Sequence, residues 1–176
     1  TAGRSGLWEG GLWKSDGTSA GTTIVSNINA GANSSNPSML TNVSGTLFFT
    51  ATDGSTNPEV WKSDGTAGGT GMVIAFGIPS SAVSLLNFTN VGGSLFFSAK
   101  TGSAGNQLWK SNGTFGGTVV VTDLQGGVVS ASPTYAPQYF SNVNGKPFFA
   151  FRDGQNPPQL WTSDGTLAGS GILASA

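Results

Sequence analysis

Histidine and cysteine are absent from this 176-residue chain, and charged side chains make up only 9% of it. Without cysteine there are no disulfides, thiolate nucleophiles or zinc–thiolate sites. Without histidine the chain lacks the side chain that most often acts as a general acid or base near neutral pH. The net charge of −1 gives no field that would attract nucleic acid or an anionic membrane, so we expect neither partner.

Long apolar runs are missing as well. No stretch approaches the roughly 18 residues of a membrane span, so we expect no membrane insertion. The N-terminus lacks the charged and apolar regions of a signal peptide, and we expect a mature or internal piece of a protein.

What the chain does contain is glycine, at 28 positions, together with 37% hydrophobic residues that include 11 Phe and 5 Trp. Disordered chains are poor in apolar residues, so this composition predicts a packed fold that is rich in turns. The length predicts one domain over residues 1–176.

The strongest pattern is an internal repeat. The string Leu-Trp-Lys-Ser-Asp-Gly-Thr begins at Leu12 and returns, with small changes, at Val60, Leu108 and Leu160, so that the Trp spacings are 48, 48 and 52. A second marker, Asn-Val followed by a turn and an aromatic pair, recurs in the same phase from Asn42, Asn90 and Asn142. A period of this length is typical of propeller blades. We predict units at approximately 1–36 (partial), 37–84, 85–136 and 137–176.

Each unit is predicted to form four antiparallel strands, because its apolar stretches are short, aromatic or β-branched, and separated by Gly, Asn and Asp. In the second unit the expected strands are 39–43, 46–51, 59–63 and 70–74. Turn pairs such as Asn144-Gly145 tolerate the positive φ of tight hairpins. The predicted fold class is all-β, a β-propeller of four-stranded blades with about four repeats of about 48 residues. A fragment of a larger propeller or array is the open alternative.

The repeated Trp residues allow two interpretations. An aromatic face could stack on a sugar ring, but a Trp at identical phase in every unit favours packing between blades. We therefore assign the structural core of the repeat to Trp13, Trp61, Trp109 and Trp161.

The Ser-Asp-Gly-Thr segments invite comparison with a calcium loop, yet one carboxylate per turn supplies too few oxygens. An Asp or Asn side chain that folds onto the backbone amide two residues on, followed by Gly, accounts for the same residues as a tight turn. We assign that turn role to Asp16, Asp64, Asn112 and Asp164 and predict no metal and no cofactor.

The string Leu-Trp-Lys-Ser-Asp-Gly-Thr, with Gly-Thr eight residues after the Trp, resembles the bacterial ELWxxDGT repeat over essentially the whole chain. The resemblance implies a secreted or cell-surface bacterial protein with a propeller-like array, and it implies no catalytic residues. The Glu of the motif is present only as Glu59, because the other units have Gly11, Gln107 and Gln159. That position cannot be an essential carboxylate here.

The leading functional hypothesis is a non-catalytic, glycan-binding or adhesive module, because the loops are rich in Asn, Ser, Thr and Gly on a repeated scaffold that would allow multivalent binding. The candidate ligand residues depart from the repeat, and they are Trp8, Tyr135, Tyr139, Asn57 and Asn106. A cap over an incomplete first unit is the alternative role of Trp8.

Two alternatives stay open. The first is a structural, self-associating surface or filament subunit completed by strand pairing between chains. The second is a propeller hydrolase or lyase, whose site would need Asp53, Asp123 and Asp153 to converge with Arg4 or Arg152.

Overall fold

The strands follow the repeat along the chain. The computed structural model describes residues 10–30, 33–54, 57–77, 83–101, 106–122, 136–152 and 157–175, and within them it contains fourteen strands and no helix. The strands form one two-stranded and three four-stranded sheets, each a meander in which neighbours in sequence pair antiparallel. An all-β fold with four-stranded antiparallel units is therefore confirmed.

The sheets are numbered here in chain order. Sheet 1 consists of β1 (Leu12–Lys14) and β2 (Thr23–Ser26). Sheet 2 consists of β3 (Ser38–Val43), β4 (Thr46–Ala51), β5 (Glu59–Ser63) and β6 (Gly71–Ile74). Sheet 3 consists of β7 (Val83–Val91), β8 (Ser94–Thr101), β9 (Asn106–Ser111) and β10 (Thr118–Thr122). Sheet 4 consists of β11 (Gln138–Val143), β12 (Lys146–Phe151), β13 (Gln159–Thr162) and β14 (Gly171–Ser175).

The first hairpin of each four-stranded sheet closes through two residues with positive φ. In sheet 2 these are Ser44 at 51° and Gly45 at 88°, and in sheet 4 they are Asn144 at 52° and Gly145 at 78°. Two consecutive residues in this region define the tight hairpin whose twist matches that of the flanking strands. The hairpins predicted from the sequence are confirmed.

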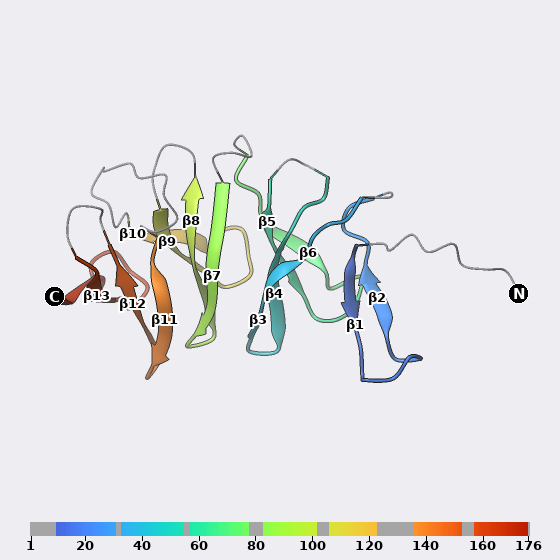
Figure 1. Cartoon of the computed structure of the whole chain (residues 1–176), viewed down its shortest axis with the longest axis horizontal. Helices are drawn as coiled ribbons and strands as arrows, with labels where there is room; N and C mark the ends of the chain where they lie inside the picture. Colours follow the sequence, from blue (N-terminus) through green and yellow to red (C-terminus); the bar gives the residue numbers. More distant parts are fainter. Residues whose placement is uncertain are drawn as a thin grey trace, which may run out of the picture.

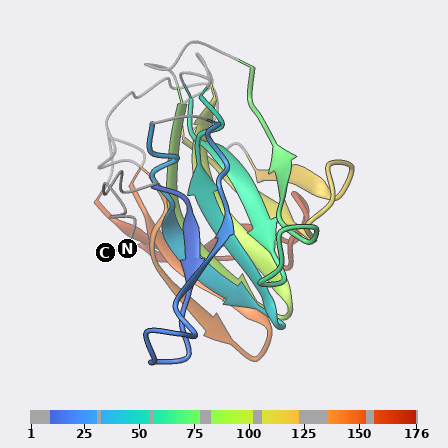
Figure 2. The ribbon, with the colours of Figure 1, turned by 90° about the vertical axis from the view of Figure 1, so that its right-hand side faces the viewer.

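The four sheets lie side by side in chain order, from sheet 1 at one end of an elongated array to sheet 4 at the other (Figure 1). Figure 2 looks along this array, so the sheets overlap one behind another. The first strands β3, β7 and β11 contact one another in sequence. This is a propeller-like arrangement of stacked meanders.

The meander gives the array two different ends. At the turn end, on the lower side of Figure 1, each four-stranded sheet carries its first-to-second strand hairpin. In the antiparallel order of the meander, the third-to-fourth strand hairpin belongs to the same end of each sheet. The opposite end of each meander, where the second strand ends and the third begins, is the loop end. The distinction matters because the two ends carry different kinds of residues.

Neighbouring sheets pack through two apolar faces. The leading face of a sheet carries four repeated positions, which in sheet 2 are Val43, Phe48, Val60 and Val73. The trailing face of the next sheet presents the alternate positions of its second strand and the repeated Trp, which in sheet 3 are Leu95, Phe97, Ala99 and Trp109. The same pairing joins sheet 1 to sheet 2 and sheet 3 to sheet 4. The core is therefore a series of equivalent layers between sheets.

Hydrogen bonds at the turn end reinforce these layers. Lys14 Nζ donates to the carbonyl of Gly65 at 2.9 Å, and Lys62 Nζ donates to that of Gly113 at 2.8 Å. A second series runs between hairpins, where the Asn90 side chain donates to the carbonyl of Asn42 at 3.1 Å. Each bond links one sheet to the next, about one repeat away in sequence. The residues that repeat most strictly thus hold the turn end together.

Candidate functional site

Two open pockets at the loop end occupy equivalent places in two different sheets. One belongs to sheet 2, has a volume of about 310 Å³, and is lined by Ser35, Asn36, Ser38, Thr50, Ala51, Thr52, Asn57 and Pro58. The other belongs to sheet 4, has a volume of about 180 Å³, and is lined by Ala136, Gln138, Tyr139, Ala150, Phe151, Arg152 and Pro158. Six lining positions of the first pocket recur in the second exactly one hundred residues later, which is the sum of the repeat spacings 48 and 52. The pocket is therefore a feature of the repeat.

The sheet 2 pocket is built by the segment that connects sheet 1 to sheet 2. Ser35 is fully buried, and its amide and hydroxyl both donate to the carbonyl of Gly10, at 2.8 and 2.7 Å. The Ser35 carbonyl in turn accepts a hydrogen bond from the amide of Thr52 at 2.9 Å. These bonds fix the connection against the end of β4. They hold one wall of the pocket in place by backbone hydrogen bonds.

The inner wall of the sheet 2 pocket is polar. The hydroxyls of Ser38 and Thr50 face each other across β3 and β4 at 2.6 Å, and Asn57 and Thr52 complete the lining. Hydroxyl and amide groups both donate and accept hydrogen bonds, and no lining residue is charged. Such a surface suits a neutral ligand with many hydroxyl groups.

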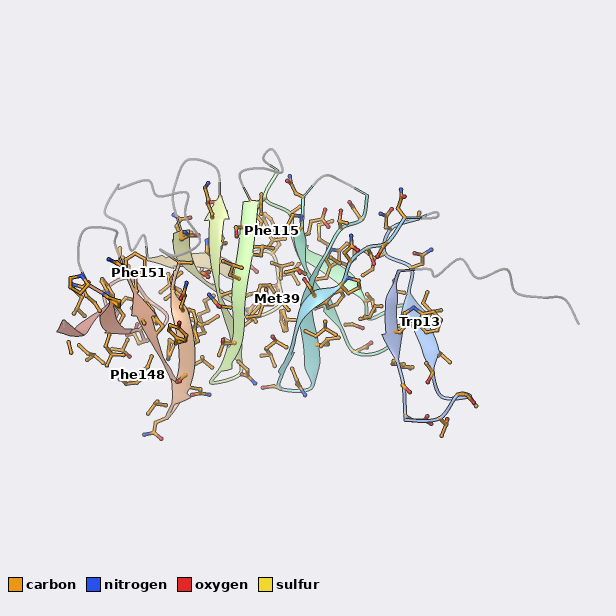
Figure 3. All side chains as sticks on the ribbon, viewed as in Figure 1. Trp13, Met39, Phe115, Phe148 and Phe151 are labelled. Carbon is orange, nitrogen blue, oxygen red and sulfur yellow. The ribbon has the colours of Figure 1, made fainter. Side chains whose placement is uncertain are left out.

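The sheet 4 pocket has a different chemistry on the same framework. Ala150 replaces the Thr50 position, Phe151 is buried and packs edge-on against Trp161 with ring centroids 6.0 Å apart, and Arg152 replaces the Thr52 position at the rim. Figure 3 labels Phe151 in sheet 4. An aromatic wall next to a guanidinium group accommodates a ring with an apolar face and polar or anionic substituents.

A bulge recurs in the first strand of all three four-stranded sheets, and in sheets 2 and 4 it adjoins the pocket. The register shifts between Ser38 and Thr41 in sheet 2, and at the corresponding points in sheets 3 and 4. The bulged residue has positive φ although it is never glycine, at 54° for Met39, 59° for Asn87 and 56° for Tyr139. Figure 3 labels Met39 in β3. A Met or Tyr in this conformation is uncommon, and strained bulges of this type re-aim side chains next to functional sites.

The side chain at the bulge makes different contacts in the three sheets. Asn87 donates to the carbonyl of Pro137 at 2.6 Å and so ties sheet 3 to sheet 4. Met39 is 40% exposed, and Tyr139 is 81% exposed at the rim of the sheet 4 pocket. In sheet 3 the bulge thus serves packing, whereas in sheet 4 it presents an aromatic ring to solvent.

The candidate ligand residues named from the sequence fall into three groups. Trp8 and Tyr135 lie outside the described residues. Asn57 and Tyr139 line the pockets of sheets 2 and 4, respectively. Asn106 is 2% exposed at the start of β9 and lines neither pocket.

The repeated Trp residues contribute to the trailing faces. Trp61, Trp109 and Trp161 are partly buried and pack against the apolar layers, and Trp109 and Trp161 stack on the Phe of the adjacent strand. Trp13 belongs to the two-stranded sheet 1 and is 50% exposed. Trp61 donates its indole N–H to Glu59 at 3.0 Å, whereas the indole N–H groups of Trp109 and Trp161 are buried without an acceptor.

The Ser-Asp-Gly-Thr segments form identical turns at the turn end. In sheet 2, Asp64 Oδ1 accepts hydrogen bonds from the amide and the hydroxyl of Thr66, at 2.8 and 2.7 Å. The hydrogen bond from the Thr66 hydroxyl, followed by that from its amide, lowers the pKa of the Asp64 carboxyl, and the corresponding threonines do the same for Asp16 and Asp164. Asn112 accepts the same two bonds without a charge, at 3.0 and 2.7 Å. Oδ1 of Asp64 and the hydroxyls of Ser63 and Thr66 are thus occupied by local hydrogen bonds.

The residues that the enzyme alternative requires fall only partly within the described ranges. Asp123, Asp153 and Arg4 lie outside the described residues, Asp53 is exposed, and Arg152 lines the sheet 4 pocket. Across the described ranges, no group of three or more His, Cys, Asp or Glu side chains could hold a metal ion. No helix long and apolar enough to cross a membrane occurs there.

The sequence pointed to three of the pocket residues, Asn57, Tyr139 and Arg152, but not to the pocket itself. Other lining residues are ordinary polar residues in strands or at strand ends, namely Ser38, Thr52 and Gln138. The bulge was not predicted because a Gly at positive φ would have indicated it, whereas the residue there is Met, Asn or Tyr. The available signal was positional, since the loop-end positions change from unit to unit while the turn-end positions change little.

Among the comparisons with known proteins, the superposition with a TM-score above 0.5 supports the fold alone. No family model and no curated protein sequence matches this chain. One solved structure, described as part of the structural and mechanistic analysis of two prolyl endopeptidases, superposes with a TM-score of 0.54 at 14% identity, over 77% of this chain and 19% of that one. A second, an α-L-arabinofuranosidase from Clostridium thermocellum, has a TM-score of 0.35 at 15% identity, over 79% of this chain and 50% of that one. This chain spans about a fifth of the length of the first structure and half that of the second.

Proposed function

We propose that the protein is a non-catalytic, glycan-binding module of a secreted or cell-surface bacterial protein, and that its sheets are blades of a β-propeller. The observation that carries the proposal is the pocket at equivalent loop-end positions of two sheets, with a strained bulge beside each. Equivalent pockets on one framework allow several weak sites to act together on a multivalent surface, which raises avidity well above single-site affinity.

The linings support saccharide ligands. The sheet 2 pocket offers only neutral polar groups and small apolar ones, and the sheet 4 pocket adds Tyr139 and Arg152. Hydroxyl-rich rings need numerous donors and acceptors together with an aromatic surface for their apolar face. The different linings lead us to expect a neutral sugar in sheet 2 and a sugar with an anionic substituent in sheet 4.

The test is binding of the whole chain to a glycan array, followed by titration calorimetry with the best saccharide. We expect Tyr139→Ala and Asn57→Ala each to weaken binding at its own pocket, and the double variant to abolish avidity for the array. Phe115→Ala is the matched control, because Phe115, labelled in Figure 3, is an aromatic residue that is 75% exposed between β9 and β10 and lines neither pocket. Absence of binding to every saccharide, or equal losses in the Phe115 variant, would refute the proposal.

A further inference from the structure

Asn36 has an unusual backbone conformation in the lining of the sheet 2 pocket. Its φ is 46°, and it directly precedes Pro37. Positive φ is uncommon for residues other than glycine, and a following proline pushes a residue towards extended backbone. The counterpart in sheet 3, Ser84, lies within the extended strand β7, where it pairs with Lys100. The repeat therefore does not require this conformation at position 36.

Hydrogen bonds on the N-terminal side hold Asn36 in place. The buried Ser35 is fixed between Gly10 and Thr52 by bonds of 2.7 to 2.9 Å. The backbone amide of Asn36 donates to Ser34 Oγ at 3.0 Å. Because Asn tolerates the left-handed region better than most residues, the conformation alone would fit a purely structural role. The contacts of the side chain decide between that role and ligand recognition.

The side chain of Asn36 is exposed, and across the part of the chain that the structure describes its amide group has no hydrogen-bond partner. Asn87 shows the contrast, since it also has a positive φ, of 59°, and its amide donates to the carbonyl of Pro137 at 2.6 Å. The amide of Asn42 likewise accepts a bond from Gly45, at 2.9 Å. These two Asn residues use their side chains to hold the backbone, whereas Asn36 leaves its donors and its acceptor available in the pocket lining.

A hydroxyl group lies two residues further on in the same lining. Ser38 is exposed, whereas Thr50 is 5% exposed, and their hydroxyls are 2.6 Å apart. Thr50 therefore supports Ser38 from the buried side. At the positions of Asn36 and Ser38, sheet 3 has Ser84 and Leu86, and sheet 4 has Ala136 and Gln138. The combination of an amide with a supported hydroxyl is thus specific to sheet 2.

Neighbouring hydroxyl groups on a saccharide ring each donate and accept hydrogen bonds. A carboxamide offers one acceptor and two donors in one plane, so one Asn side chain can bind both hydroxyls of such a pair, and a serine hydroxyl can bind a further group. We propose that Asn36 orients the ligand of the sheet 2 pocket, and that this pocket recognises a neutral saccharide through two adjacent hydroxyl groups. The inference rests on the proposed glycan-binding function. The fixed backbone holds the amide in place before the saccharide arrives, which lowers the entropy lost on binding.

The test uses the Tyr139→Ala chain, which leaves the sheet 2 pocket as the expected site, and an array of neutral saccharides. Asn36→Gly in this background removes the amide and keeps the backbone, because Gly adopts positive φ without strain. We expect the concentration for half-saturation to rise at least about tenfold, since two hydrogen bonds are lost. The midpoint of thermal unfolding should not fall, because the strain at this position is relieved.

Met39→Gly is the matched control. Met39 has a φ of 54° three residues further along the chain, and it is not part of the pocket lining. Its replacement therefore relieves the same kind of strain without removing a lining group. We expect this variant to bind the array within about twofold of the Tyr139→Ala parent.

Periodate treatment of the array tests the ligand class, because periodate cleaves the carbon–carbon bond between adjacent hydroxyl-bearing carbons. We expect oxidation to abolish binding. Binding that survives oxidation, or an equal loss in the Asn36→Gly and Met39→Gly variants, would overturn the proposal. So would a loss in Asn36→Gly that comes with a lower unfolding midpoint.

The Asn57→Ala variant separates this proposal from the proposed function. If Asn57→Ala weakens binding to the neutral saccharides while Asn36→Gly leaves it unchanged, the role of Asn36 is wrong and the glycan-binding function stands. If the parent chain binds no saccharide at all, both are wrong.

Discussion

Lys62 donates to the carbonyl of Gly113, which lies 51 residues further along the chain in the next sheet, with Nζ and O 2.8 Å apart. Lys14 makes the equivalent bond to Gly65, but in a more exposed position. The lysine of the repeat is therefore a connection between units as well as a surface charge. Its contribution to stability should depend on how well the bond is shielded from water.

Replacing Lys62 by Met keeps most of the apolar stem and removes the donor. We expect Lys62→Met to lower the free energy of unfolding by about 1–2 kcal/mol, because a partly buried carbonyl loses a charged donor. Lys14→Met should cost less than about 0.5 kcal/mol, because water replaces the lost donor at an exposed carbonyl. Urea unfolding of both variants measures the difference, and equal losses would contradict this role of Lys62.

Two adjacent glycines of the turn should respond in opposite ways to alanine. A Cβ on Gly69 would overlap the carboxylate of Asp64, which its hydrogen bonds to Thr66 hold in place, whereas nothing lies within 4 Å of a Cβ on Gly68. We expect Gly69→Ala to destabilise the chain by about 1–3 kcal/mol. Gly68→Ala should be neutral or stabilising by up to about 1 kcal/mol, because it restricts the unfolded chain. Thermal unfolding of the pair would disprove this account if both variants behaved alike.

The three turn aspartates predict a specific loss of stability in acid. Hydrogen bonds from threonine lower the folded-state pKa of Asp16, Asp64 and Asp164 below the ordinary value of 3.8. A lowered folded-state pKa means that the stabilisation is complete above the unfolded-state pKa and is lost as the pH falls through the folded-state pKa. We expect the free energy of unfolding to decline as the pH drops below about 4.

The matched variant for this pH dependence already exists in the third repeat. Asn112 makes the same hydrogen bonds without a titrating group. A triple variant with Asn at positions 16, 64 and 164 should therefore show a shallower decline between about pH 4 and pH 2.5 in urea unfolding. An unchanged slope would assign the acid sensitivity to other carboxylates.

Glu59 provides the acceptor for the indole of Trp61, at 3.0 Å, from a position only 2% exposed. Glu59→Ala should cost about 1–3 kcal/mol, because the indole N–H would lose its partner in a partly buried site. Glu59→Gln retains a side-chain oxygen and should cost less than about 1 kcal/mol. Denaturant midpoints of the two variants decide the matter, and similar losses in both would indicate that the charge matters more than the acceptor.

Tyr139 has a strained backbone and an exposed side chain, so we expect its replacement to raise stability and to weaken saccharide binding. The residue has a φ of 56° and is 81% exposed, so its side chain gains little from packing to offset an unfavourable backbone. Tyr139→Asn, which copies Asn87 of the preceding sheet, should raise stability by about 0.5–1 kcal/mol and weaken saccharide binding. An Asn variant that is more stable and binds equally well would remove Tyr139 from the proposed site.

The repeat allowed the strands to be predicted almost to the residue. The expected strands 46–51 and 59–63 are β4 (Thr46–Ala51) and β5 (Glu59–Ser63), because alternation of apolar residues and fixed turn signals define both boundaries. The bulge at Met39, Asn87 and Tyr139 could not be predicted, since its φ is imposed by neighbouring strands and not by the residue at the bulge. The pocket was equally hidden, because its walls join a connection, a strand end and a loop that are distant in sequence.

Because the turn end and the loop end are separate, substitutions at the loop end need not affect the contacts at the turn end. The contacts of Lys62 with Gly113 and of Asn90 with Asn42 join units at the turn end, so a substitution at positions 52, 139 or 152 leaves these two contacts intact. The lining of a pocket can therefore change from unit to unit without loss of the architecture. The polar lining around Asn57 and the aromatic, cationic lining around Tyr139 show how far two pockets at equivalent positions differ on one framework.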